Sequence, residues 1–426
     1  MPTLAFFEDE AVAHLKPLIH TRPVYDLRAG ILPLRHRIEL DLGRHADFLL
    51  SRPEVRSLAS LEGNGSPQTS LPDERADSTL FINGRLLTAG AHLVGEWRAL
   101  LEGDGESPSW GRRWRSGETV VAAWCPSMQS IRLENGVPAF DDLEAIEVQQ
   151  ARLVNRLWDL VGDVARFIDD DASAMGVRGV SDDAIVSAEA LLIGTHFMAV
   201  GPGAVIEPGA ILISDEGPVI VERDAHIMAG AILRGPCHIG KGSRVKMGAR
   251  VTSSSLGEQC RVGGEVSNSV LLGFSNKAHD GYVGNSYIAA WCNIGADTNT
   301  SNLRNDYGEV TLYNEHLRKY ESSGSQFVGL IMGDHSRSGI NTMFNTGTVV
   351  GLACNVFGAG YQPRHIPSFS WGGRDRLMDN NPEKVFASIR AMMERRGKVL
   401  SADEEAALAA VYESGHADIY PSGSSP

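Results

Sequence analysis

Paired cysteines are missing from this sequence. Its 426 residues include five cysteines, an odd number, and none stands in a Cys-x-x-Cys spacing. A zinc knuckle or a disulfide framework is therefore not expected, and a reducing cytoplasm is the simplest compartment. The cysteines are Cys125, Cys237, Cys260, Cys292 and Cys354.

Long apolar runs and an excess of positive charge are missing as well. No stretch of about 18 uncharged apolar residues occurs, and the first ten residues, MPTLAFFEDE, become acidic with no basic segment before them. We therefore expect neither a membrane span nor a signal peptide. Lys and Arg number 39 against 53 Asp and Glu, a formal net charge of −14. Such a surface repels phosphate backbones and anionic lipid, so nucleic acids and membranes are not expected partners.

Glycine is abundant, and most of it lies in one region. Residues 194–373 hold 28 of the 46 glycines, and the other 246 positions hold 18. Glycine fits tight backbone corners, so this region is expected to turn often. Charged residues make up 22% of the chain and apolar residues 42%, as in folded globular domains.

An aliphatic residue recurs every six positions through the glycine-rich region. A helix repeats every 3.6 residues and an alternating strand every two, so neither gives this period. A parallel β-helix does, because one inward side chain per face stacks on the coil below. The main run is Val221, Ile227, Leu233, Ile239, Val245 and Val251, with an earlier run at Val200, Ile206 and Leu212 and a later one at Ile340, Thr346 and Leu352.

The repeat is interrupted by a polar excursion at residues 297–327, which contains aromatic residues. Repeat proteins carry insertions on one face, and such loops often bind ligands. The alternative is a scaffold alone, because stacked coils bury a core without catalysing anything. His226 and His238 lie only two hexads apart, whereas stacked positions on one face are about eighteen residues apart, so we expect satisfied corner histidines rather than a metal site.

Several segments resemble one enzyme family. Residues 275–285 (SNKAHDGYVGN) and 293–298 (NIGADT) are similar to the Lys-Ala-Gly-His-x-x-Tyr-x-Gly-Asp and Asn-x-Gly-Ala-Gly-Thr blocks of the bifunctional N-acetylglucosamine-1-phosphate uridylyltransferase/glucosamine-1-phosphate acetyltransferase family. Residues 333–347 and 366–373 resemble a variant group of sugar nucleotidyltransferases built on the same plan. Residues 21–35 (TRPVYDLRAGILPLR) are similar to that group's Thr-Arg-Pro…Leu-Arg-x-Gly-Ile…Arg signature.

The resemblance implies a fold class of α/β plus all-β. It implies a divergent sugar nucleotidyltransferase-like domain over residues 1–140 and a helical connector over 141–190. A left-handed parallel β-helix, the acyltransferase-like domain, would follow over 191–373, and C-terminal helices and a tail over 374–426. Homotrimers with active sites between adjacent β-helices are expected.

The resemblance also assigns roles in acetyl transfer. His279 takes the position of the general base, and a neutral imidazole suits that task because it titrates near working pH. Tyr282 is placed at the sugar phosphate and Asn293 at the sugar, although a corner histidine and an asparagine ladder are the structural alternatives. Either Asn302 or Asn305 corresponds to the family's Asn-Tyr-Asp-Gly segment.

One departure concerns the lysine that the family uses to bind the sugar phosphate. The family places it in the coil before the histidine, and residues 264–270 of this chain contain none. Lys277, Arg261 and Arg304 are the possible replacements. The acceptor of the acetyl group is therefore open.

The amino-terminal segment predicts a buried first strand at residues 3–7, ended by Glu8 and Asp9. Ordinary sugar nucleotidyltransferases follow this strand with a glycine-rich phosphate loop, and here the only nearby glycine is Gly30. The resemblance implies that Gly30 and three arginines hold the nucleotide phosphates, because arginine pairs with phosphate in bidentate fashion. Surface arginines are the alternative. The arginines are Arg22, Arg28 and Arg35.

The metal ligands stay unknown. Nucleotidyl transfer uses Mg²⁺, which prefers carboxylate oxygens. Asp163 and the Asp169–Asp171 run are candidates, but an acidic run is more often a solvated cap.

Helices are expected around the β-helix. Apolar residues at helical spacing predict an amphipathic connector helix over about 141–168. Asn381 and Pro382 predict a helix start and Gly397 its end. Ser401 to Glu404 forms a capping-box pattern that opens a last helix.

Together these features predict a cytoplasmic enzyme of sugar-nucleotide biosynthesis. Its partners would be an NTP, a sugar-1-phosphate and acetyl-CoA, with Mg²⁺ for nucleotidyl transfer and His279 as base for N-acetylation of an amino sugar phosphate. The alternatives are a nucleotidyltransferase with the β-helix as a trimerisation scaffold, and a non-catalytic sugar-nucleotide sensor. Which sugar and which nucleotide base are used is not given by the residues.

Overall fold

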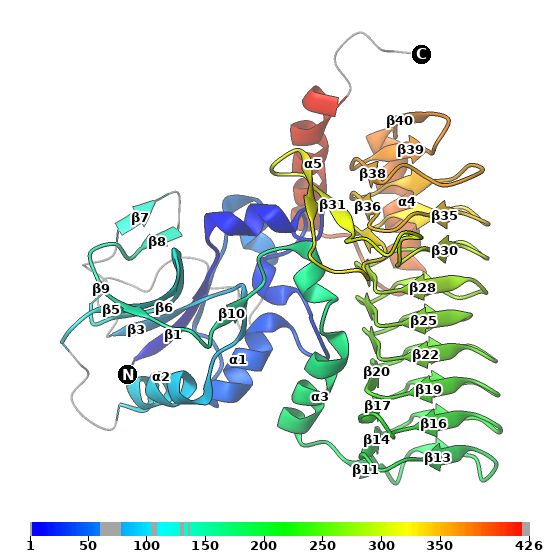
Figure 1. Cartoon of the computed structure of the whole chain (residues 1–426), viewed down its shortest axis with the longest axis horizontal. Coiled ribbons are helices and arrows are strands. Elements are labelled where there is room, and N and C mark those ends of the chain that lie inside the picture. Colours follow the sequence, from blue (N-terminus) through cyan, green and yellow to red (C-terminus); the bar gives the residue numbers. More distant parts are fainter. Residues whose placement is uncertain (1, 60–77, 104–108, 128–131, 135–136, 420–426) are drawn as a thin grey trace. The chain divides into compact units, whose positions relative to one another are not determined.

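A computed structural model describes residues 2–59, 78–103, 109–127, 132–134 and 137–419 (Figure 1). The chain forms two compact units that alternate along the sequence. The first unit comprises Met1–Ala13, Thr21–Leu27 and Leu32–Asn155, and the second comprises His14–His20, Arg28–Ile31 and Arg156–Pro426. The four-part division expected from the sequence stays a prediction.

The first unit is built on a six-stranded mixed sheet. The strand order is β2-β1-β3-β6-β5-β9, with β1 parallel to β2 and β3, and β6 antiparallel to β3 and β5. The strands are β1 (Thr3–Phe7), β2 (Phe48–Leu50), β3 (Thr79–Asn83), β5 (Arg112–Ser116), β6 (Thr119–Cys125) and β9 (Glu144–Glu147). Two small pairs accompany the sheet: β4 (Leu86–Thr88) with β10 (Arg152–Leu153), and β7 (Arg132–Glu134) with β8 (Val137–Ala139).

The predicted first strand is confirmed and is buried on both faces. Leu4 and Phe6 pack in one apolar cluster with the helices α1 (Leu34–Leu42) and α2 (Ala91–Glu102). Ala5 and Phe7 pack in a second cluster on the opposite face. Short 3₁₀ helices complete the described elements at this end of the chain: η1 (Glu10–Leu15), η2 (Val24–Asp26) and η3 (Pro53–Leu58).

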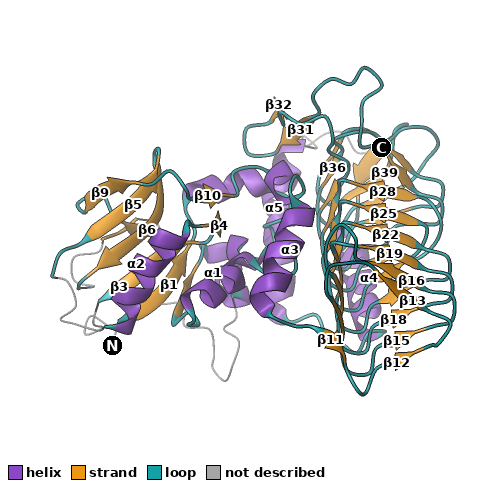
Figure 2. Ribbon diagram, turned by 60° about the horizontal axis from the view of Figure 1, so that its bottom comes forward, coloured by secondary structure: helices purple, strands orange, loops and turns teal. Residues whose placement is uncertain are grey.

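The second unit is a parallel β-helix with three faces, and each coil contributes one short strand to each face (Figures 1 and 2). The first face stacks β11 (Gly179–Val180), β14 (Met198–Val200), β17 (Val219–Val221), β20 (Cys237–Ile239), β23 (Ser255–Leu256), β26 (Val270–Leu271), β29 (Tyr287–Ile288), β33 (Ile331–Met332), β36 (Val349–Val350) and β38 (His365–Ile366). The predicted fold class, an α/β domain followed by a left-handed parallel β-helix with C-terminal helices, is confirmed.

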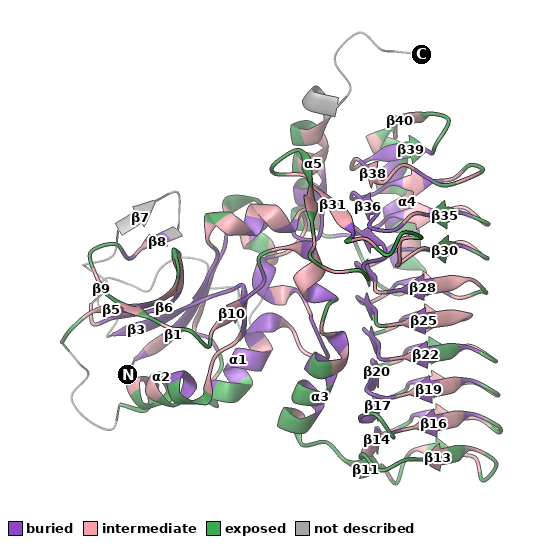
Figure 3. Cartoon of the chain, viewed as in Figure 1, coloured by how far each residue is buried: buried purple, intermediate pink, exposed green. Residues whose placement is uncertain are grey.

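The other two faces follow the same coils. The second face contains β12 (Ile185–Val186), β15 (Val205–Ile206), β18 (His226–Ile227), β21 (Arg244–Val245), β24 (Arg261–Val262), β27 (Asn276–Lys277), β34 (Arg337–Ser338), β37 (Asn355–Val356), β39 (Ser370–Gly372) and β40 (Leu377–Asp379). The third contains β13 (Leu191–Ile193), β16 (Ile211–Ile213), β19 (Ile232–Arg234), β22 (Arg250–Thr252), β25 (Glu265–Ser267), β28 (Tyr282–Gly284), β30 (Asn299–Thr300) and β35 (Met343–Phe344). Strands at the start of the β-helix, such as β13, are the more exposed ones (Figure 3).

The six-residue run from Val221 to Val251 is confirmed as the core of the β-helix. All six of its side chains are at most 1% exposed and belong to one apolar cluster. The earlier run from Val200 to Leu212 lies in the same cluster. A single continuous column of aliphatic side chains therefore holds the coils together.

The later run was predicted in the wrong phase. Ile340 is 73% exposed, and Leu352 is buried against the C-terminal helices rather than inside the coils. The inward positions here are Met332, Ser338, Phe344, Val350 and Val356. The period of six is kept, but Ile340 lies two residues past an inward position, in the turn that follows β34. Leu352 fitted the repeat because the C-terminal helices bury an apolar residue at a turn, whereas Ile340 is an exposed aliphatic residue.

The corners only partly follow the glycine prediction. Gly230 and Gly248 have φ near +70° at the corner between the second and third faces. At the corner between the first and second faces, Phe274 and Trp291 both take a φ of 63°, and their rings stack 4.1 Å apart. A left-handed conformation is uncommon for bulky residues. Ring stacking and burial under the C-terminal helices accompany it here.

The connector helix predicted over 141–168 is wrong for most of its length. The strands β9 and β10 and the short 3₁₀ helix η5 (Leu157–Leu160) occupy that range, and the helix α3 begins later and spans Val164–Met175. The aliphatic side chains from Leu153 to Val164 are buried, and those of Leu143 and Ile146 are half-buried. Leu153 is buried by pairing of β10 with β4. Pairing with a distant strand overrides the local helical period.

Both C-terminal helices begin where the sequence predicts. The helix α4 spans Pro382–Glu394, and the Asn381 side chain accepts a hydrogen bond from the Lys384 amide at 3.1 Å. The helix α5 spans Ala402–Ile419, and Ser401 and Glu404 exchange hydrogen bonds in a capping box. In the described part of the chain, no helix is both long enough and apolar enough to cross a membrane.

The register of the late coils can be tested by comparing a substitution at an inward position with one at an exposed position nearby. Phe344→Ala removes a side chain with no exposed surface and is expected to lower the free energy of unfolding by about 3–5 kcal/mol. Ile340→Ala removes an exposed side chain and is expected to change it by less than about 0.5 kcal/mol. Urea unfolding followed by circular dichroism measures both, and equal losses would contradict the register.

Candidate functional site

The turn between β27 and β28 carries His279, the predicted general base. His279 is exposed, as is Asp280, and the turn links the second face of the β-helix to the third. Among the described residues, no side chain or backbone group hydrogen-bonds the His279 imidazole. An exposed imidazole with this freedom can accept a proton from a substrate that docks on the corner.

Lys277 lies inside the β-helix, directly below this turn. It is paired with Val262 in the coil before and has no exposed surface. Its ammonium donates to the backbone carbonyls of His279 and Asp280, the latter at 2.7 Å. Lys277 therefore occupies an inward position where neighbouring coils have aliphatic residues, and it fixes the backbone that presents His279.

Burial lowers the pKa of Lys277 to about 8, although the nearby carboxylates of Asp280 and Asp297 favour the charged form. A buried ammonium is tolerated only when carbonyl oxygens or charges satisfy it. The two carbonyls of the turn supply that satisfaction. The cation and the conformation of the turn thus depend on each other.

Tyr282 and Asn302 meet on the third face. The Asn302 amide donates to the Tyr282 hydroxyl at 3.1 Å and to the Asn285 side-chain oxygen at 2.7 Å. Ser267 lies 3.1 Å from the same hydroxyl. This polar cluster lies one strand away from His279, and it ties the start of the excursion to β28.

Asn305 and Asn293 lie elsewhere. Asn305 is exposed in a loop where the Arg304 guanidinium pairs with Asp306. Asn293 lies on the second face, and its side-chain oxygen accepts from Asn276 at 3.4 Å, which is the geometry of an asparagine ladder. The structure thus brings Asn302 to Tyr282, and it does not bring Asn305 or Asn293 into that cluster.

The four residues predicted to hold nucleotide phosphates fall in different compact units. Arg22 and Arg35 belong to the first unit, where Arg35 donates to Asp26 at 2.9 Å. Arg28 and Gly30 belong to the second, where the Arg28 amide donates to the Tyr287 hydroxyl.

Gly30 is part of a tight packing contact. A Cβ atom at this position would lie 2.6 Å from the Asp171 carboxylate and from the Phe167 carbonyl of α3. The neighbouring Ile31 amide donates to Asp171 at 2.7 Å. Glycine is thus required here by the approach of α3, and Asp171, once a metal candidate, is buried in this contact.

Sequence reasoning missed a cluster at the carboxyl ends of β1 and β3. Parallel strands of α/β sheets place ligands at this edge. Asp9, just after β1, accepts two hydrogen bonds from the Arg85 guanidinium, at 2.7 and 2.5 Å, and one from Asn83 at 2.8 Å. Glu8 accepts from the Arg52 guanidinium at 2.7 Å and from the Val24 amide at 2.7 Å. The Glu8-Asp9 pair that ends the first strand was the available signal.

This edge does not fit a magnesium site. Burial raises the pKa of Glu8, which Arg52 and backbone amides partly offset, and both carboxylates are already held by arginines. Across the described ranges, no group of three or more His, Cys, Asp or Glu side chains is arranged to hold a metal ion. The residues described here therefore do not supply a preformed cage for Mg²⁺.

His226 and His238 are hydrogen-bonded histidines on different faces, as predicted, but they lie within the strands β18 and β20 and not at corners. His226 lies 2.5 Å from Glu207 on the second face. On the first face, the two ring nitrogens of His238 lie 3.0 Å from Ser255 and from Glu222. The three residues form a row whose residue types are those of a catalytic triad, but the likeness is one of composition only. Ser255 is 1% exposed and His238 has no exposed surface, so no substrate reaches the hydroxyl. The row is a buried polar network.

The buried state of Lys277 gives a pH-dependent prediction. An unfolded lysine has a pKa near 10.4, so between about pH 8 and pH 10.4 the unfolded chain binds more protons than the folded one. The free energy of unfolding of the wild type should therefore rise with pH in this window relative to Lys277→Met. Urea unfolding at several pH values measures this difference. Lys241→Met, which changes an exposed lysine, is the control and should show no such trend.

Comparisons with known proteins concern both parts of the chain. Residues 4–177 match the model of the family described as sugar nucleotidyl transferase. A bifunctional sugar-1-phosphate nucleotidylyltransferase/acetyltransferase of Sulfurisphaera tokodaii is 37% identical over 145 residues, which is 33% of this chain and 36% of that protein. The bifunctional protein GlmU of Methanocaldococcus jannaschii is 36% identical over 90 residues, which is 21% of each chain. The chain thus spans about a third or less of the length of these curated relatives.

Solved structures overlap the chain only loosely. A UDP-N-acetylglucosamine acyltransferase of Francisella novicida superposes with a TM-score of 0.27 at 12% identity, covering 52% of this chain and 74% of that one. The Campylobacter jejuni enzyme of the same name gives a TM-score of 0.24 at 14% identity, over 54% and 95% of the two chains. Residues 4–177, less than half of the chain, are thus similar to the sugar nucleotidyl transferase family.

Proposed function

We propose that this protein is a transferase of sugar-nucleotide biosynthesis with two activities. The first is nucleotidyl transfer from an NTP to a sugar-1-phosphate. The second is acetyl transfer from acetyl-CoA to the amine of an amino sugar phosphate. The observation that carries the proposal is that one chain joins a sugar nucleotidyl transferase segment to a β-helix with His279 exposed at a corner. The two bifunctional relatives support the pairing of activities.

In acetyl transfer, the amine nitrogen attacks the thioester carbon of acetyl-CoA. A C–N bond forms and the C–S bond breaks. His279 removes the proton that the amine loses, and that proton passes to the sulfur of CoA, which leaves as the thiol. Lys277 fixes the turn that presents His279. The Tyr282 and Asn302 cluster on the neighbouring strand offers donors for the sugar phosphate or its hydroxyls.

In nucleotidyl transfer, a phosphate oxygen of the sugar-1-phosphate attacks the α-phosphorus of the NTP, and pyrophosphate leaves. Charge on the phosphates calls for arginines, which pair with them in bidentate fashion. Arg22, Arg35 and Arg52 belong to the first unit and are the proposed candidates there. Arg85 is not one of them, because its guanidinium has no exposed surface and is held by Asp9 and Asn155. The Mg²⁺ that such a transfer uses would be held in part by the triphosphate itself, because magnesium is usually bound by one or two carboxylates together with substrate phosphates.

We also propose that the protein works in the cytoplasm as a homotrimer. The five free, buried cysteines suit a reducing compartment. Several exposed apolar side chains lie on the outside of the β-helix, including Ile340 and Met247, and association of β-helices would cover such residues. Light scattering after size exclusion measures the mass, and a monomer at working concentration would contradict the trimer.

The nucleotidyl transfer is tested by a panel of NTPs and sugar-1-phosphates, with release of pyrophosphate as the readout. At least one pair is expected to release it. If no pair releases pyrophosphate but a sugar nucleotide binds measurably, the protein is a non-catalytic sensor and not a nucleotidyltransferase. Pyrophosphate release without any CoA release from acetyl-CoA would leave a nucleotidyltransferase on a β-helical scaffold.

The role of His279 is tested by substitution. His279→Asn is expected to lower kcat for CoA release by about 10²–10⁴-fold, the usual contribution of a general base, while pyrophosphate release is unchanged. His92→Asn is the matched control, because His92 is an exposed histidine on α2 of the other unit. A wild-type kcat for CoA release in His279→Asn would show that His279 is not the general base.

A further inference from the structure

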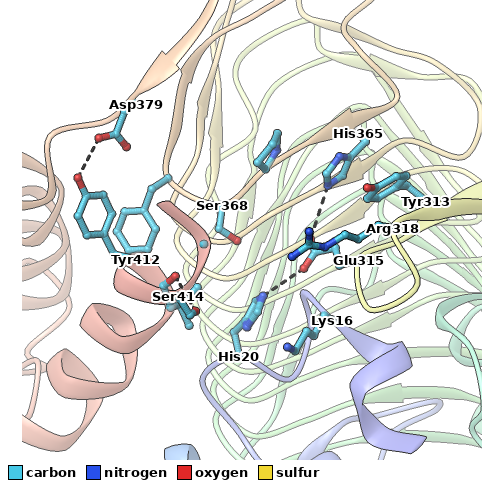
Figure 4. Close-up of a pocket in the computed structure, with 14 residues that line it drawn as sticks. Lys16, His20, Tyr313, Glu315, Arg318, His365, Ser368, Asp379, Tyr412 and Ser414 are labelled. Carbon is cyan, nitrogen blue, oxygen red and sulfur yellow. Dashed lines mark hydrogen bonds and ion pairs between the residues drawn. The ribbon is translucent and has the colours of Figure 1, made fainter. Parts of the chain in front are cut away.

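Charged side chains of the second unit commonly lie beside a partner that satisfies them. A cavity of about 300 Å³ is one example, lined by the segment before residue 21, the hairpin of β31 (Thr311–Asn314) and β32 (Lys319–Ser322), the segment from β38 to β40, and α5 (Figure 4). One oxygen of the Glu315 carboxylate lies 3.3 Å from the His20 ring, and the other lies 3.9 Å from the His365 ring. Burial alone would raise the pKa of Glu315, but the two histidines lower it to about 2. The acid of this cavity is thus matched by residues of the same unit.

Arginines on the third face of the β-helix are matched in the same way. The Arg234 guanidinium lies 2.9 Å from a Glu216 oxygen. The Arg250 guanidinium lies 2.8 Å from an oxygen of Glu265, the residue opposite it in the next coil. Each of these arginines therefore has its counter-charge within salt-bridge distance.

Arg244 and Arg261 on the second face depart from this arrangement. They lie directly opposite each other in the ladder between β21 and β24, on successive coils, where strands are about 4.8 Å apart. The residues that follow them, Val245 and Val262, have no exposed surface, so the two arginines face outward on the same side. Like charges directly opposite each other destabilise a sheet. The fold thus carries a repulsive pair where an acid would be stabilising.

The described residues supply no counter-charge to this pair. Across the described ranges, neither guanidinium makes a hydrogen bond or an ion pair. Burial lowers the pKa of Arg261, and the charge of Arg244 lowers it further. Residues 225–257, which contain the whole coil of Arg244, include no Asp or Glu, although the chain as a whole has a net charge of −14.

The carboxylates on the surrounding coils have other contacts. Glu207 and Glu222 each lie within hydrogen-bonding distance of a histidine ring. Glu258 lies at the corner before β24, and its side chain is turned toward the next coil, where its Cγ lies 3.1 Å from the position that a Cβ of Gly273 would take. These acids therefore do not form salt bridges with the arginine pair.

A third guanidinium reaches the same face from the end of α4. Arg396 follows this helix and donates to the Asn276 side-chain oxygen at 3.0 Å and to the Gln259 carbonyl at 3.4 Å. Asn276 lies opposite Arg261 in the next coil, which places the Arg396 guanidinium beside Arg261. Both acceptors are neutral, so they hold the Arg396 side chain in place without cancelling its charge.

Three positive charges thus gather on one outward face of the β-helix. A guanidinium offers five N–H donors in a planar fork, and it pairs with phosphate oxygens in bidentate fashion. One small anion on a single arginine would leave the charge on the next coil unmatched, whereas two linked phosphates can span successive coils. A local arrangement that costs stability is also what functional sites commonly show.

We propose that Arg244, Arg261 and Arg396 form a binding site for a diphosphate group, either as inorganic pyrophosphate or as part of a nucleotide. The two phosphates lie across the coils of β21 and β24, and Arg396 closes the site on the side of α4. None of the three arginines is assigned to the proposed transfer reactions. Failure of those reactions would therefore leave this site standing, and the reverse also holds.

The test is protection of Arg244 and Arg261 from phenylglyoxal, an arginine-selective reagent, in the full chain. Mass spectrometry of the peptides reads the modification of each arginine separately, so ligand bound elsewhere in the protein does not affect the readout. The probes are inorganic pyrophosphate and uridine 5′-diphosphate, with inorganic phosphate and uridine as partial ligands. Arg250 is the internal reference, because it is paired with Glu265 on another face.

Pyrophosphate or uridine 5′-diphosphate is expected to protect Arg244 and Arg261 with saturation, while Arg250 is modified at an unchanged rate. Inorganic phosphate is expected to protect at least about tenfold more weakly. Equal protection by the two diphosphates identifies the diphosphate group as the feature recognised. Protection by pyrophosphate alone identifies an inorganic ligand, and protection by uridine 5′-diphosphate alone identifies a nucleotide.

A variant examines the contribution of α4. Arg396→Gln is expected to raise about tenfold the diphosphate concentration that half-protects Arg261, the loss of one charge-assisted hydrogen bond. Arg250→Gln is the matched control and should leave that concentration unchanged, because it removes an arginine of the third face. His279→Asn should also leave it unchanged, which separates this site from the acetyl-transfer site.

Three results would overturn the proposal. The first is that neither diphosphate protects Arg261 at millimolar concentration. The second is that inorganic phosphate protects as well as the diphosphates do, which would reduce the face to a simple anion site. The third is that Arg244 and Arg261 do not react in the ligand-free protein although Arg250 does, which would indicate that another copy of the chain covers this face. Circular dichroism shows whether each variant folds, and the wild-type series tests the site without any variant.

Discussion

The inward stacking of one side chain per hexad determines where every other residue of the β-helix lies. Once Val221, Ile227 and Leu233 face inward on three successive strands, their neighbours must face outward, and the two or three residues between strands must turn. The corner positions are therefore fixed by the core and not by their own preferences. His279 is exposed because it follows an inward residue at such a corner.

The same constraint explains the unusual residue at the centre of the candidate acetyl-transfer site. The inward position before the His279 turn holds Lys277, whose charge cannot remain unsatisfied in an apolar core. The carbonyls of the turn meet that need, and in return the ammonium fixes the turn. The interruption of the apolar column thus marks the coil where chemistry is proposed. A second polar assembly, around Glu315, arises where the excursion returns to the coils and meets other segments of the same unit.

Local sequence predicted much of this fold and part of the site. Residues 3–7, the hexads from Val200 to Val251 and both C-terminal helix starts are confirmed, because each depends on a local period or a capping pattern. The predicted phase of the late coils and the predicted connector helix were wrong. The spacing of Ile340 also fits an exposed turn residue, and the spacing of Leu153 also fits a strand. The cluster of Asp9, Asn83 and Arg85 was missed because Asp9 lies more than 70 residues before the other two in the sequence.

By itself, the sequence determined the period of the β-helix, the strand that begins the first unit and the family resemblance near residue 279. These features are local, so a few neighbouring side chains specify them. Only the tertiary structure decided that Lys277 points inward, that Asn302 and not Asn305 meets Tyr282, and that Arg22 and Gly30 lie in different compact units. It also brought Lys16, Glu315 and Asp379 around one cavity. Such placements depend on which coil, hairpin and helix meet in space, and that is set by packing between residues far apart in the chain.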